Sequence, residues 1–119
     1  MKRKTRIITV NDEKFAWWYK IGNETEVKLS PIDDKTSTIT VAFPCDSKFN
    51  EEFVISICMT KEDEKCCIKV IEPQMAGLLL SYISEHHMFI TRCNTILNGF
   101  DLLSKMGYSI CEVKRGLYW

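Results

Sequence analysis

The 119-residue sequence has no hydrophobic run long enough to cross a membrane. Its longest apolar stretch, 75–80, falls far short of the roughly 20 residues that a membrane-spanning helix needs. The apolar run 7–10, which follows the basic N-terminus, is too short for a signal peptide, and Asn11 and Asp12 follow it at once. We therefore expect a cytoplasmic protein without a membrane partner.

The chain also lacks a surplus of charge of either sign. Its 16 basic and 16 acidic side chains cancel, whereas nucleic-acid binders depend on a positive electrostatic field. One feature keeps a nucleic-acid interpretation open, because basic arms track phosphates and aromatic side chains on a sheet can stack bases. That feature is the basic set Lys2, Arg3, Lys4 and Arg6 ahead of the aromatic segment 15–19. The balanced charge nevertheless favours other functions.

Metal-ligand spacing is missing, although six cysteines are present. A structural zinc site needs pairs such as C-x2-C, whereas Cys66 and Cys67 are adjacent and would point to opposite faces of a strand. The only two histidines, His86 and His87, are adjacent as well and would diverge by about 100° on a helix. We expect no metal and no cofactor, and six reduced thiols that act as small apolar groups, since the cytosol is reducing.

Catalytic motifs are lacking too. The sequence contains no G-x-S-x-G, no H-E-x-x-H and no phosphate-binding glycine loop. Its paired acidic residues fall in predicted turns, whereas acid–base catalysis needs carboxyl groups that converge in a cleft. We therefore name no catalytic residue and expect a binding protein rather than an enzyme. A cysteine nucleophile paired with His86 or His87 remains an open alternative.

The first 71 residues are rich in strand patterns. Apolar side chains alternate most clearly in 37–43 and 53–59, and turn signals such as Gly22-Asn23 and Pro44 separate the segments. Short connections favour an antiparallel meander of about five to six strands over residues 5–71. The expected strands are 5–10, 15–21, 25–29, 37–43, 53–59 and 66–71.

The pattern changes to helical spacing at Pro73, which suits the first position of a helix. Apolar residues three and four apart predict one helix over about 73–87 and a second over about 92–106, with Gly107 as its C-terminal cap. Residues 108–113 predict a final strand. Strands followed by helices indicate one α+β domain over residues 1–119, with both helices packed on one face of the sheet.

The most informative segment is Phe15-Ala16-Trp17-Trp18-Tyr19, which places large aromatic side chains on both faces of one strand. If Trp17 and Tyr19 face the helices, Trp18 lies on the open face, where polar residues are usual. An exposed aromatic in a mixed patch predicts a partner-binding surface, so Trp17, Trp18 and Tyr19 are the candidate binding residues. The expected neighbours of Trp18 are Ile7, Thr38, Thr40, Val54, Ser56, Lys69 and Ile71. A second possibility is that the second helix or segment 117–119 covers Trp18.

A strand, a tight turn and a tryptophan-rich second strand over 7–19, followed by a meander and a proline-initiated helix over 72–86, resemble a group of small uncharacterised bacterial α+β proteins. The resemblance spans roughly residues 1–85 and implies the fold, but it carries over no site. We predict a non-catalytic protein-binding module, such as an inhibitor, an immunity-type protein or an accessory protein, that acts through a sheet face or edge. The alternatives are a small cysteine-dependent enzyme or redox protein and a nucleic-acid binder. An unpaired edge strand also favours a homodimer formed by strand addition.

Overall fold

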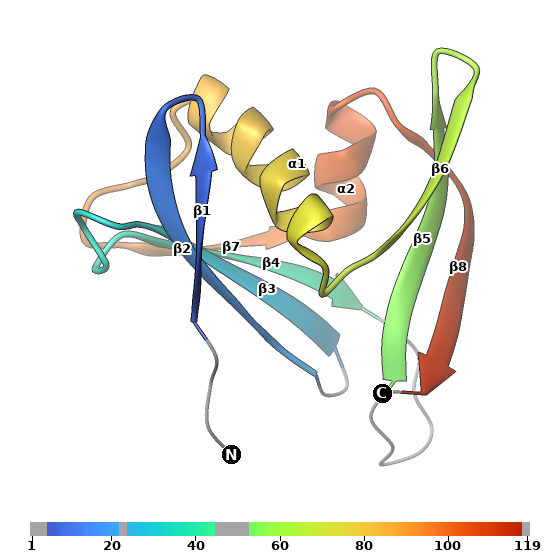
Figure 1. Cartoon of the computed structure of the whole chain (residues 1–119), viewed down its shortest axis with the longest axis horizontal. Helices are drawn as coiled ribbons and strands as arrows, with labels where there is room; N and C mark the ends of the chain where they lie inside the picture. Colours follow the sequence, from blue (N-terminus) through green and yellow to red (C-terminus); the bar gives the residue numbers. More distant parts are fainter. Residues whose placement is uncertain (1–4, 22–23, 45–52, 118–119) are drawn as a thin grey trace.

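The computed structural model describes residues 5–21, 24–44 and 53–117, with only the backbone described for 53–54 and 114–117. Within these residues the chain forms eight strands in two sheets and two helices, which confirms the α+β class (Figure 1). The predicted meander is divided between the two sheets, because its fifth and sixth strands pair with each other and not with the first four.

The first sheet has five strands in the order β1-β2-β3-β4-β7. Its first four strands form an antiparallel meander, and β7 pairs with β4 in parallel. The strands are β1 (Arg6–Val10), β2 (Glu13–Lys20), β3 (Glu24–Pro31), β4 (Thr38–Pro44) and β7 (Asn94–Asn98). β1 and β7 are therefore the two edges of this sheet.

The second sheet has three antiparallel strands in the order β6-β5-β8. They are β6 (Glu64–Lys69), β5 (Phe53–Lys61) and β8 (Ser109–Leu117), and β8 corresponds to the final strand predicted over 108–113. Two tight turns set the strand registers. Asn11–Asp12 joins β1 to β2 and Glu62–Asp63 joins β5 to β6, with both residues of each turn at positive φ. This is the two-residue turn whose twist matches that of the flanking strands.

The first helix, α1 (Pro73–Glu85), confirms the range predicted from helical spacing. Its buried side chains are Met75, Ala76, Leu79, Leu80 and Ile83. At its end the amide of Met88 donates to the carbonyl of Ile83 (3.1 Å) and the amide of His87 donates to that of Ser84 (3.2 Å). This hydrogen-bond pattern needs a left-handed residue after the helix, and His87 supplies it with φ 51°.

The second helix, α2 (Gly99–Lys105), is shorter than the predicted range 92–106, because residues 94–98 form β7 instead. The side-chain Oδ1 of Asn98 accepts hydrogen bonds from the amides of Phe100 (3.0 Å) and Asp101 (3.1 Å), so α2 begins after Asn98. Upstream of this cap, residues 94–98 pair with β4, and this tertiary pairing overrides the helical spacing.

One hydrophobic core joins both sheets and both helices. Figure 1 shows α1 and α2 on one side of the five-stranded sheet, with the three-stranded sheet beyond α2. The largest fully buried side chains include Trp17, Phe15 and Phe43. The longest helix in the described ranges has 13 residues, and none of the helices there is long and apolar enough to span a membrane.

Candidate functional site

The candidate site is the face of the five-stranded sheet that points away from the helices, which we call the open face. Strand alternation places Trp18 on it, directly opposite Lys28 of β3. The same row continues through Thr40 of β4 to Ile96 of β7. Trp18 is half-buried in this position.

The other two candidate residues lie on the opposite side of the sheet. Trp17 is 1% exposed and belongs to the core, so it cannot contact a partner while the sheet is intact. Tyr19 is half-buried beside it, with 6.4 Å between the ring centroids. The guanidinium of Arg6 lies 5.3 Å from the Trp17 ring centroid and 5.9 Å from that of Tyr19, at cation–π distance from both. Of the three predicted residues, Trp18 alone faces outward from the open face.

The neighbours of Trp18 differ in part from the expected set. Ile7, Thr38 and Thr40 do lie on the open face. Val54, Ser56, Lys69 and Ile71 do not, because they lie in or next to the second sheet. Lys28 and Ile96, on β3 and β7, were not expected there. Period-two alternation predicts the side of each strand, but not which strands become neighbours.

Both edge strands of the open face carry an exposed isoleucine, and we call this pair the apolar rim. Ile7 on edge strand β1 is 64% exposed, and Ile96 on edge strand β7 is 70% exposed. Between them the small side chains Ala16, Ser30, Thr40 and Ala42 are buried, so the larger side chains form the surface.

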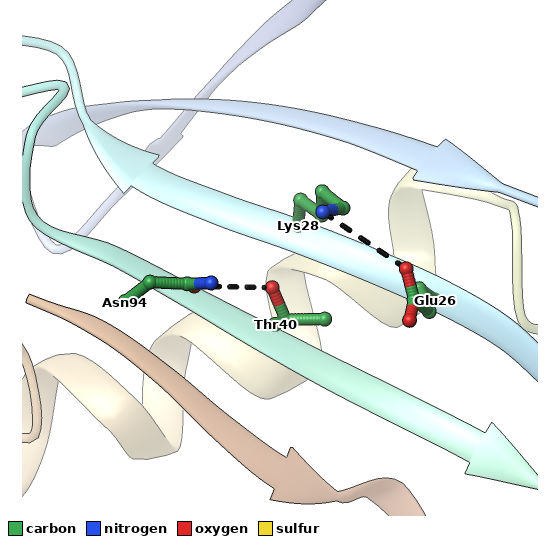
Figure 2. Close-up of polar contacts among 4 residues, drawn as sticks. All are labelled: Glu26, Lys28, Thr40 and Asn94. Atoms are coloured by element: carbon green, nitrogen blue, oxygen red, sulfur yellow. Dashed lines mark hydrogen bonds and ion pairs between the residues drawn. The ribbon is translucent and has the colours of Figure 1, made fainter.

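Polar contacts order part of this face (Figure 2). The Thr40 hydroxyl donates to Asn94 Oδ1 (3.3 Å), and Lys28 Nζ lies 3.9 Å from Glu26 Oε1. The indole Nε1–H of Trp18 is buried and has no acceptor in the described part of the chain. A buried donor without a partner destabilises a fold by about 1–3 kcal/mol, so Trp18 is not held there by its own hydrogen bond.

The second possibility was that the second helix or segment 117–119 covers Trp18, and the structure excludes the helix. Both helices contact the other side of the sheet. Leu117 is the last residue of β8 in the second sheet, while Tyr118 and Trp119 lie outside the described residues. Helix α2 therefore does not cover Trp18.

The two histidines lie in different surroundings. The imidazole of His86 stacks on the Tyr82 ring at 4.0 Å, and its Nδ1 lies 2.9 Å from the Tyr82 carbonyl oxygen. His87 borders a cavity of about 200 Å³ at the C-terminal end of α1, together with Glu13 and Ser84 over an apolar floor. No cysteine lines this cavity. Sequence reasoning missed Glu13 and Ser84, although Ser84 precedes His87 by one helical turn.

The cysteines correct one prediction outright, because Cys58 and Cys67 form a disulfide instead of remaining reduced. The turn at Glu62–Asp63 sets the register of the β5–β6 hairpin and places the two cysteines directly opposite each other. Counting outward from that turn could have found the pair. Cys66 and Cys93 are half-buried free thiols, Cys111 is an exposed free thiol, and Cys45 lies outside the described residues.

The nucleic-acid alternative gains little from this geometry. Arg6 is engaged with the two core-side aromatic rings, and Lys2, Arg3 and Lys4 lie outside the described residues. The metal-ligating side chains of the described ranges form no cluster of three or more.

The chain matches no family model, no curated protein and no solved structure. No residue role or activity is therefore carried over from a relative.

Proposed function

We propose that this protein is a non-catalytic protein-binding module, of the inhibitor, immunity or accessory type, that docks through the open face of its five-stranded sheet. The observation that carries the proposal is the pair of exposed isoleucines, Ile7 and Ile96, on the two edge strands of the face that holds Trp18. The helices already cover the other face.

The energetics favour a partner that covers this rim. Burial of an exposed isoleucine contributes about 1.5–3 kcal/mol, and both Ile7 and Ile96 are more than half exposed. Large apolar and aromatic side chains at the centre of an interface usually dominate its affinity. Lys28 and Glu26 beside Trp18 bring both signs of charge to the face, so a partner with a complementary pattern would be selected.

The expected cytoplasmic location in a bacterium belongs to the same proposal. The test therefore treats cytoplasmic and envelope extracts separately. The immobilised protein is exposed to each extract, and captured proteins are quantified by mass spectrometry. The baits are the wild type, Ile7→Asp, Ile96→Asp and the matched control Ile90→Asp, since Ile90 is 56% exposed but lies outside both sheets.

The expected result is a protein captured by the wild type and by Ile90→Asp but lost from both Ile7→Asp and Ile96→Asp. Circular dichroism checks that all four baits are folded. Equal capture by every bait, or no capture above the background of the empty resin, would contradict the proposal.

A homodimer through an edge strand is the second way in which this sheet could bind. Within the described residues β1 is an edge strand that pairs only with β2, so the backbone groups on its other side form a row without a strand partner. Sedimentation velocity of the purified protein distinguishes the two cases, because a dimer forms without any extract.

A further inference from the structure

We propose that Cys58, Cys67 and Cys111 form a thiol–disulfide exchange site on the outer face of the three-stranded sheet, with thiols and disulfides as its substrates. The site is separate from the open face and needs no partner bound there. It rests on the strand registers, which bring three of the six cysteines to one face.

The disulfide joins two sulfur atoms in different surroundings. Cys58 lies on the central strand β5 and is 2% exposed, whereas Cys67 lies on edge strand β6 and is exposed. Their Cα atoms are 4.1 Å apart, as expected for residues directly opposite each other. An external molecule can therefore reach Cys67, while Cys58 is shielded by its neighbours.

A bulge in β8 places Cys111 on the strand across β5 from Cys67, next to the residue that pairs with Cys58. Met59 pairs with Ile110 and Cys58 pairs with Glu112, which leaves Cys111 as the extra residue of β8. In such a bulge two residues stand opposite one residue of the partner strand. The Cys111 thiol lies 3.9 Å from the hydroxyl of Thr60.

That contact fixes the face on which the Cys111 thiol lies. Thr60 and Cys58 are two residues apart on β5 and point to the same side of the sheet. Cys111, Cys58 and Cys67 therefore lie on one face, on the neighbouring strands β8, β5 and β6, and Cys58 is the disulfide cysteine on the strand next to Cys111.

The exchange step balances without an added oxidant or reductant. The Cys111 thiol loses its proton to water, and the thiolate attacks the sulfur of Cys58. The Cys58–Cys111 bond forms as the Cys58–Cys67 bond breaks, and Cys67 leaves as a thiolate that carries the negative charge. The exposed Cys67 thiolate then attacks the disulfide of a second molecule, forming a mixed disulfide and releasing one thiolate of that molecule.

The proposed cytoplasmic location, on which this step rests, favours exchange over a purely structural cross-link. Disulfides in cytosolic proteins are rare, and those present are usually transient and catalytic or redox-sensing. Cys111 also has the exposure that a thiol nucleophile requires.

The first measurement counts free thiols. The protein is purified without reductant, denatured and alkylated with N-ethylmaleimide, and its intact mass is recorded. With two of the six cysteines in the disulfide, four adducts are expected. Six adducts would overturn the proposal.

The second measurement maps connectivity in a Cys66→Ser background, so that the tryptic peptide 66–69 contains one cysteine. Native protein is incubated at pH 8, quenched with acid, alkylated and digested. Peptide 49–61, which holds Cys58, is expected in linkage with 66–69 and also with 106–114, which holds Cys111. Absence of the 106–114 linkage would overturn the exchange.

The third measurement uses oxidised glutathione as the substrate. In the same Cys66→Ser background, glutathionylation of peptide 66–69 is expected to fall at least about 10-fold when Cys111→Ser is added, because Cys67 is no longer released. It should stay unchanged in Cys93→Ser, the matched control for loss of a free thiol. Equal glutathionylation in both variants, with unchanged urea unfolding midpoints, would show that Cys111 takes no part.

Discussion

Replacing Gly99 with alanine is expected to destabilise the protein through a single steric conflict. Gly99 is the buried first residue of α2. A β-carbon built on its backbone would overlap ring carbons Cδ1, Cε1 and Cζ of Phe43. Phe43 is fully buried and packs edge-to-face against Phe100 at 5.5 Å, so its ring has little room to move.

The magnitude follows from two opposing effects. Overpacking of a filled core lowers the free energy of unfolding by about 1–3 kcal/mol. Alanine in place of glycine in a helix raises it by at most about 1 kcal/mol. We expect the free energy of unfolding of Gly99→Ala to fall by about 2 kcal/mol, as measured by urea denaturation followed by tryptophan fluorescence.

Gly77→Ala is the matched control. Gly77 lies inside α1, and its added β-carbon would meet only Ile8 Cδ1 at 3.4 Å, an ordinary contact. This variant should gain about 0.5–1 kcal/mol, because alanine lowers the entropy of the unfolded chain. In the double variant Gly99→Ala/Phe43→Leu the loss should be smaller than the sum of the single losses, since the conflict is gone. A Gly99→Ala protein within 0.5 kcal/mol of the wild type would refute the reasoning.

Three further predictions concern single side chains. His87→Gly should raise the free energy of unfolding by about 0.5–1 kcal/mol, because φ is 51° at a position where glycine carries no steric penalty; lower stability in urea would show that the imidazole is stabilising. Asn98→Ala should lower the free energy of unfolding by about 1 kcal/mol through loss of the α2 cap, and an unchanged urea midpoint would contradict this. Hydrogen bonds from Ser37 and Thr36 lower the pKa of the Asp34 carboxyl below its ordinary value. The ionised carboxylate therefore contributes fully to the free energy of unfolding above about pH 4, and this contribution is lost as the pH falls through the folded-state pKa. Asp34→Asn should therefore flatten the acid limb of the stability curve, and parallel curves for variant and wild type would count against this cause.

Local sequence determined the turns and helix ends that depend only on a few adjacent residues. Asn11 and Asp12 favour the positive φ that a two-residue turn needs, and Pro73 can begin a helix without losing a needed donor. Alternation likewise predicted that Trp17 and Trp18 lie on opposite faces of β2. The sequence alone therefore placed Trp18 on the open face, but it did not give all of its neighbours there. The Cys58–Cys67 pair was also within reach of local reasoning, since the hairpin turn determines it.

Tertiary structure alone decided which strands became neighbours. Residues 94–98 share their apolar spacing with a helix, and they form a strand because the β4 edge, far away in the sequence, offers hydrogen-bond partners. The same long-range choice separates β5 and β6 from the first sheet, removes Val54 and Ile71 from the surroundings of Trp18, and brings Ile96 in. It also brings Cys111 to the face of the second sheet that carries Cys58. Turn and cap preferences depend on a few adjacent residues, whereas strand pairing is settled by which distant segments can together satisfy their backbone groups and bury their apolar faces.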